Sequence, residues 1–180
     1  MTKGLDVEVS EVAVPNTNIV VDLFLFDMGG QSIFNQRQMA KRFWENCSYI
    51  ICVFDVSSRK SLQSVKTWVA SVRSASATLL DIPTILVANK IDLREVSFLL
   101  WETIQVQFLL PLKSHTCSHF FVIKEVDSIA EIDKDEGKKY ADYHGFQYFE
   151  CSTETCTNVA APFQHIAKES AAQYQQESYA

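Results

Sequence analysis

Apolar and polar positions follow two periods along this chain, one typical of strands and one typical of helices. Five runs favour strands, at residues 5–12, 19–26, 48–56, 82–89 and 146–151. The turn-forming residues between the first two runs predict an antiparallel hairpin. The third and fourth runs are almost wholly apolar. Strands of that kind are covered on both faces, which is typical of a parallel sheet.

Four further segments carry the helical period, at residues 35–46, 59–76, 126–144 and 158–176. In the second segment one helical face holds the apolar residues Leu62, Val65, Trp68, Val69 and Val72. In the third we expect Ile129, Ile132 and Tyr140 to point inward and Gly145 to end the helix. Strands that alternate with helices predict an α/β fold with a mostly parallel sheet and a hairpin at one edge.

Composition narrows the class of protein. The 180 residues are enough for one domain with its own core. A net charge of −6 without a basic stripe argues against nucleic-acid binding. The five cysteines form no CxxC pair, so we expect reduced thiols in a cytosolic protein. The first residues hold no apolar signal segment and the last hold no cysteine for prenylation, so we expect neither.

The sharpest chemical signal is Asn89-Lys90-Ile91-Asp92, which directly follows a buried strand. A carboxylate at Asp92 can accept hydrogen bonds from the N1–H and the exocyclic amino group of guanine, a donor pair that adenine lacks. The Asn89 amide can serve the N7 edge of the base, and the aliphatic stem of Lys90 can lie over it. Taken alone, these four residues fit an ordinary polar loop between a strand and a helix as well as they fit a base-binding motif.

A second stretch, Asp27-Met28-Gly29-Gly30-Gln31, also follows a strand. A carboxylate at the carboxyl end of a strand, here Asp27, can hold Mg²⁺ through water. Gly30 has no Cβ, so its N–H can approach a γ-phosphate, and Gln31 can orient the attacking water. The alternative is a glycine-rich turn that leads into a helix.

The third stretch, Glu150-Cys151-Ser152-Thr153, follows the last predicted strand. Backbone N–H groups in such a loop can bind the carbonyl oxygen of guanine, although a capping serine before a helix is the simpler explanation for this stretch alone. The three stretches together are more specific, because ligands of open α/β sheets bind at the carboxyl ends of the strands. The sequence therefore predicts a guanine-nucleotide site at this edge.

With these motifs in this order, residues 2–95 and 126–177 resemble the small GTPases of the Ras and Rab type. The resemblance implies a three-layer α/β sandwich, the P-loop NTPase fold, that binds GTP or GDP with Mg²⁺. It places Thr2 at the Mg²⁺-binding threonine of the first switch, and it assigns Asp27 to the same ion and Gln31 to catalysis.

Two residues depart from the pattern of that family. Phe26 stands where Rabs usually carry Trp, and Glu154 replaces the usual Lys of the last guanine loop. The second departure weakens the assignment of that loop.

The flanking residues resemble one branch of the family, the Rab-like subunit of the intraflagellar transport B complex. The resemblance lies in 21–27, in Ala161-Pro162-Phe163 and in the missing prenylation cysteine. It implies a place in the cytoplasm and the cilium or flagellum without a lipid anchor. It also implies a small β-sandwich subunit as the partner in a heterodimer. The alternative is a nucleotide-independent scaffold subunit of a ciliary transport complex.

The phosphate-binding loop of this family, GxxxxGKS or GxxxxGKT, does not occur in the 180 residues. We therefore expect an incomplete domain that lacks the first strand, the phosphate loop and the first helix, and no tight GTP binding or hydrolysis by this polypeptide. The family's sheet order is 2-3-1-4-5-6. Without its central strand, the facing edges of 19–26 and 48–56 are left open, which weakens folding.

Residues 96–125 interrupt the pattern of the family. Without them, the chain runs from 93–95 directly into the expected helix. We interpret the segment as a translated intron. An intron begins with the nucleotides GT, which also begin a valine codon and so fit Val96. It ends with AG, which fits Glu125 if its codon is GAG. The alternative is a real insertion, either a loop that touches a membrane or a strand that fills the central gap. The segment is too short and too interrupted by polar residues to span a bilayer.

Overall fold

A computed structural model describes residues 5–28, 47–74, 81–94 and 129–178. The expected helix at 35–46 and the segment 96–125 lie outside these residues. The described elements follow in the order β1 (Leu5–Ala13), β2 (Val20–Met28), β3 (Ile50–Asp55), α2 (Arg59–Arg73), β4 (Thr84–Asn89), α4 (Lys134–His144), β5 (Gln147–Glu150) and α5 (Ala161–Ser178). All five predicted strands are present, each within two residues of the expected ends.

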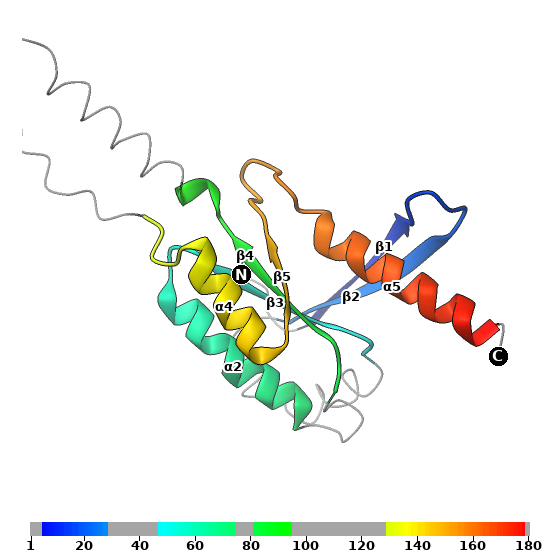
Figure 1. The fold of residues 1–180 in the computed structure, drawn as a ribbon, viewed down its shortest axis with the longest axis horizontal. Helices are drawn as coiled ribbons and strands as arrows, with labels where there is room; N and C mark the ends of the chain where they lie inside the picture. Colours follow the sequence, from blue (N-terminus) through cyan, green and yellow to red (C-terminus); the bar gives the residue numbers. More distant parts are fainter. Residues whose placement is uncertain (1–4, 29–46, 75–80, 95–128, 179–180) are drawn as a thin grey trace, which may run out of the picture.

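The strands β3, β4 and β5 form a parallel sheet with β4 in the middle. Its helices lie on both faces: α2 and α4 run side by side over one, and α5 lies over the other (Figure 1). Alternate residues of β4 face the two layers, because successive side chains of a strand point in opposite directions. Leu86 and Ala88 belong to the core under α2 and α4, and Ile85 and Val87 to the core under α5. The expected three-layer α/β arrangement is thus confirmed.

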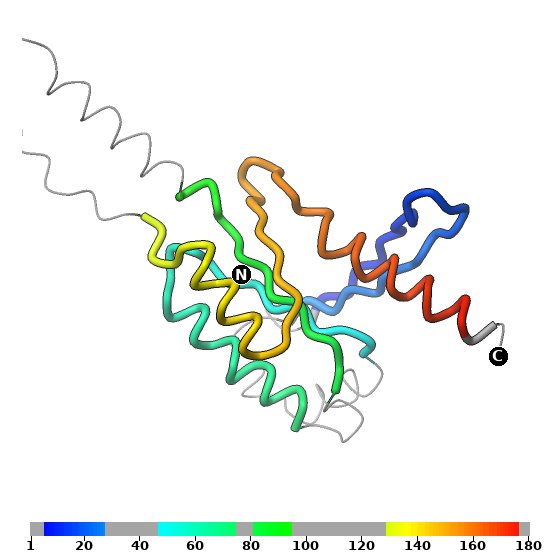
Figure 2. The backbone as a smooth tube through the Cα atoms, viewed as in Figure 1, coloured from blue at the N-terminus to red at the C-terminus, as the bar shows by residue number. Residues whose placement is uncertain are grey.

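The hairpin of β1 and β2 is a separate antiparallel sheet in the described part of the chain. No hydrogen-bonded ladder joins β2 to β3 among the described residues, so the edges expected to be open are not paired with each other. Side chains hold the hairpin in place instead. Leu23 lies in the same core as Ile85 and Ile166, and Val14 packs against Ala167 of α5. Figure 2 shows the hairpin beside α5.

The helix expected at 126–144 begins later, at Lys134. The Asp133 side chain accepts a hydrogen bond from the Glu136 N–H at 2.7 Å, which makes Asp133 the N-cap. Residues 129–132 before it are not helical, and the N–H groups of Glu131 and Ile132 both donate to the Val56 carbonyl oxygen.

The later start of α4 changes which side chains are buried. The expectation that Ile129 points inward was wrong, since 41% of its surface is exposed. Ile132 is fully buried and Tyr140 packs partly against the core, as expected. Gly145 caps the helix in the left-handed conformation, with φ of 69°, which an L side chain rarely adopts.

Two other helix boundaries also differ. The helix α2 ends at Arg73, where Ser74 is its C-cap, and α5 begins at Ala161 rather than at 158. Pro162 is the second residue of α5, where a missing N–H costs no helical hydrogen bond. In the parts of the chain that the structure describes, no helix is both long and apolar enough to cross a membrane.

Candidate functional site

Three polar residues end neighbouring parallel strands at the same edge of the sheet. Asp55 and Asn89 are paired in the register of β3 and β4, and Ala88 is paired with Glu150 of β5. The loops that leave these strand ends therefore lie next to each other. Because each loop starts from a strand in a fixed register, the positions of their first side chains are set by the sheet.

The Asn89 side chain joins the β4 loop to the β5 loop. Its Oδ1 accepts hydrogen bonds from the Lys90 N–H at 2.8 Å and the Thr153 N–H at 3.2 Å. The Lys90 backbone adopts a positive φ of 65°, which turns the chain sharply after the strand. Asn89 therefore acts as a structural link as well as a candidate contact to a base.

Asp92 and Ser152 form the second link between these loops. The Ser152 hydroxyl donates to Asp92 Oδ1 and accepts from the Thr155 N–H at 3.1 Å. Ser152 is fully buried, and its backbone exchanges two hydrogen bonds with Thr157. The loop after β5 is thus closed on itself and pinned to the Asp92 carboxylate, which is only partly buried.

Lys90 is held by an ion pair that was not predicted from the sequence. Its Nζ lies 2.6 Å from Asp55 Oδ2. Burial raises the pKa of Asp55, but hydrogen bonds from Lys90 and Ser57 outweigh it and leave that pKa below its ordinary value. The hydrogen bond to Asp55 raises the pKa of Lys90. The strand-end rule that selected Asn89 would also have found Asp55, because both residues end parallel strands.

Two further residues support these loops and were not predicted from the sequence. Arg94, one helical turn beyond the β4 loop, forms an ion pair with Glu150 at 2.6 Å. Tyr148 shares the same carboxylate oxygen. No local pattern signals such a pair, because its members are far apart in the sequence.

The other predicted site residues are described only in part. Thr2, Gly30 and Gln31 lie outside the described residues. Asp27 is the penultimate residue of β2, exposed, and opposite Asp6 of β1. One carboxylate of the expected Mg²⁺ set does not make up an ion site, and no group of three or more candidate metal ligands occurs within the described ranges.

The described side chains make an edge suited to a planar heterocycle with adjacent donors. The Asp92 carboxylate is a partly exposed acceptor and Asn89 offers an amide. The Lys90 side chain, half exposed, lies between them in sequence and is anchored at its tip by Asp55. Such an arrangement can accept two donors from one base edge while an aliphatic stem covers its face.

Comparisons with known proteins found relatives and a family model that match most of this chain. A human protein named intraflagellar transport protein 27 homolog is 27% identical over 169 residues, which cover 94% of this chain and 72% of that protein. A Chlamydomonas reinhardtii protein named intraflagellar transport protein 27 is 38% identical over 94 residues, which cover 52% of this chain and 45% of that protein. A Theileria parva protein named Ras-related protein Rab-1 is 26% identical over 168 residues, which cover 93% of this chain and 59% of that protein. The family model described as "Ras family" matches residues 1–172, and the chain belongs to that family.

Proposed function

We propose that this protein is a Rab-like guanine-nucleotide switch that acts in intraflagellar transport. Membership of the Ras family supports the first part of the proposal. The names of its relatives from human, mouse and Chlamydomonas support the second. A place in the cytoplasm and the cilium or flagellum, in the transport B complex and beside a small β-sandwich subunit, belongs to the same proposal.

One observation supports guanine recognition most strongly. The loop that carries Asn89 and Asp92 and the loop that carries Ser152 and Thr153 are joined by side-chain hydrogen bonds at a single edge of the sheet. A carboxylate fixed there pairs with the N1–H and amino group of guanine. Adenine has no such donor pair, so binding adenine would desolvate the carboxylate and leave it with the Ser152 hydroxyl but no donor from the base.

The phosphate half of the proposal rests on Asp27 at the end of β2 and on Thr2, Gly30 and Gln31, which lie outside the described residues. Thr2 and Asp27 would hold Mg²⁺, which would neutralise charge on the phosphates. Gly30 would donate its N–H to the γ-phosphate, and Gln31 would orient the attacking water. The GTP and GDP states would differ in the order of the loops that carry these residues, and partners would respond to that difference.

The 180-residue polypeptide itself should bind GTP weakly. Its sequence holds no phosphate-binding loop, so the triphosphate charge would meet few N–H donors and no loop lysine. We expect GTP and guanosine to bind this polypeptide with similar affinity, and we expect no measurable GTP hydrolysis.

The proposal is tested by titrating guanosine, adenosine and GTP into the protein and following saturation-transfer NMR signals. We expect guanosine to bind at least about tenfold more tightly than adenosine, the value of one unmet charged hydrogen bond. Equal binding of the two nucleosides would refute guanine recognition. In that case the second candidate, a scaffold subunit that works without nucleotide, would be the better proposal. GTP binding far tighter than guanosine binding would refute the expectation for the phosphates.

A further inference from the structure

Two side chains from different parts of the fold meet on one carboxylate beside the base-recognition loops. Glu150 Oε1 accepts a hydrogen bond from Arg94 Nη1 at 2.6 Å and a second from the Tyr148 hydroxyl at 2.9 Å. Arg94 lies two residues after Asp92, and Glu150 lies two residues before Ser152. The ion pair therefore bridges the same two loops that Asp92 and Ser152 connect.

We propose that Arg94, Glu150 and Tyr148 are positioning residues that set the spacing of the two base-recognition loops. Gly137 of α4 provides the space that this arrangement needs. The inference rests on the proposed function, because it concerns how the same guanine site is held. These residues do not reach the base themselves; they act through Asp92 and its neighbours.

The Arg94–Glu150 pair has the features of a strong, oriented contact. Only 20% of the Arg94 side chain and 17% of the Glu150 side chain are exposed, so solvent screens the pair less than a surface pair. Arg94 Nε also donates to the Ile132 carbonyl oxygen at 3.1 Å. Two contacts from different nitrogens fix the direction of the planar guanidinium group, which a lysine could not reproduce.

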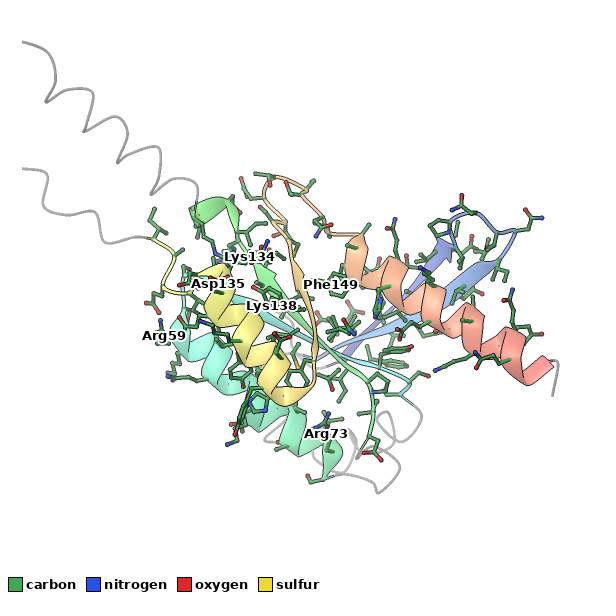
Figure 3. All side chains as sticks on the ribbon, viewed as in Figure 1. Arg59, Arg73, Lys134, Asp135, Lys138 and Phe149 are labelled. Carbon is green, nitrogen blue, oxygen red and sulfur yellow. The ribbon has the colours of Figure 1, made fainter. Side chains whose placement is uncertain are left out.

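Tyr148 adds a neutral donor to the same oxygen. Burial raises the pKa of Tyr148, and the hydrogen bond and charge of Glu150 raise it further. The hydroxyl therefore keeps its proton near neutral pH and remains a donor to Glu150. Lys134, labelled in Figure 3 at the start of α4, lies 3.8 Å from the other carboxylate oxygen. Glu150 is thus held from α4 as well as from the β4 loop.

Gly137 explains how the tyrosine reaches this position. A Cβ at Gly137 would lie 2.5 Å from the Tyr148 hydroxyl oxygen and 3.1 Å from Cζ of its ring. Glycine is unfavourable inside a helix, and Gly137 is a buried residue of α4. Close approach of the tyrosine is a physical reason for glycine here, and a side chain at this position would push the hydroxyl away from Glu150.

The first test uses hydrogen exchange of two loop amides. The Thr153 N–H donates to Asn89, and the Thr155 N–H donates to Ser152, so both report on how the loops are held. In Tyr148→Phe and Glu150→Gln we expect both amides to exchange about threefold to tenfold faster. Amides inside α2, such as that of Val69, should be unchanged.

Tyr143→Phe is the matched control, because Tyr143 is another tyrosine of this region, 85% exposed, and loses the same hydroxyl. The control should exchange as the unchanged protein does. Equal acceleration in the loops and in α2 would show a general loss of stability and overturn the proposal, and so would unchanged exchange in the loops.

The second test measures the ratio of guanosine to inosine affinity, since inosine lacks the exocyclic amino group that Asp92 is expected to bind. Displaced loops should weaken the binding of guanosine more than the binding of inosine. We therefore expect the ratio of the two affinities to fall about threefold in Glu150→Gln. An equal loss for both nucleosides would overturn the role in specificity. If the unchanged protein does not prefer guanosine to adenosine, the proposed function fails, and the exchange rates still decide whether these residues position the loops.

Discussion

The buried hydroxyl of Ser152 is the contact whose removal should weaken the candidate site most clearly. Ser152 is 0% exposed, donates to the Asp92 carboxylate and accepts from the Thr155 N–H. In Ser152→Ala both partners lose this group. Alanine fills most of the same space, so the change tests the two hydrogen bonds rather than packing.

The expected magnitude follows from those two bonds. A hydrogen bond to a charged group contributes about 1.5–3 kcal/mol, and a neutral one about 0.5–1.5 kcal/mol. Water can reach the partly exposed Asp92 carboxylate and replace part of the loss. We therefore expect the free energy of unfolding to fall by about 2–3 kcal/mol, which at a urea dependence of about 2 kcal/mol/M lowers the midpoint by about 1–1.5 M.

Urea unfolding followed by circular dichroism measures this change, with Ser64→Ala as the control. The Ser64 hydroxyl donates to the Lys60 carbonyl oxygen within α2. Its loss should shift the free energy of unfolding by no more than about 0.5 kcal/mol, because alanine favours the helix. If Ser152→Ala also stays within about 0.5 kcal/mol of the unchanged protein, the Asp92–Ser152 link does not hold the loops as described.

Three further predictions follow from the core and its thiols. Leu86→Ala, at a fully buried residue of the middle strand, should lower the free energy of unfolding by about 2–5 kcal/mol in the same urea assay; a loss under about 1 kcal/mol would contradict the packing. Burial raises the pKa of Cys52 from 9.0 to about 11, so the fold favours the neutral thiol. Stability should therefore be intact below pH 9 and fall by about 2 kcal/mol by pH 11, and Cys52→Ala should lose that part of the pH dependence. Among the four cysteines that the structure describes, Cys156 is exposed and should react first with a thiol reagent at neutral pH, as peptide mass spectrometry can show; faster labelling of Cys52 or Cys151 would contradict their burial.

Local patterns predicted most of the described fold. The apolar runs of β3 and β4 and the helical period of α2 are properties of neighbouring residues, so a single sequence is enough to recognise them. The start of α4 was predicted too early, because it depends on which acceptors the backbone N–H groups before Asp133 find. The N–H groups before Asp133 bond to the Val56 carbonyl oxygen, in a distant part of the sequence, rather than to a continuing helix.

In the candidate site, too, some residues could be predicted from the sequence and some contacts could not. Asn89, Asp92, Ser152 and Thr153 were predicted from their places after strands, and the structure brings their loops together. Their binding of guanine stays a prediction. The pairing of Arg94 with Glu150 depends on side-chain positions that only the folded chain defines.

The most direct test of guanine recognition replaces one acceptor oxygen of the Asp92 carboxylate with an amide nitrogen, which donates. In Asp92→Asn the amide can still accept the N1–H of a base, but it now donates where the exocyclic amino group of guanine stood. Xanthosine carries a carbonyl oxygen at that place and so becomes the complementary nucleoside. Asp135→Asn, on the exposed side of α4 and labelled in Figure 3, removes the same charge away from the site.

Saturation-transfer titration of guanosine and xanthosine into both variants makes this measurement. We predict that Asp92→Asn loses affinity for guanosine by about tenfold or more and binds xanthosine in its place, while Asp135→Asn keeps the preference for guanosine. Unchanged guanosine binding by Asp92→Asn, or an equal response in the two variants, would contradict the assignment of Asp92 to the base.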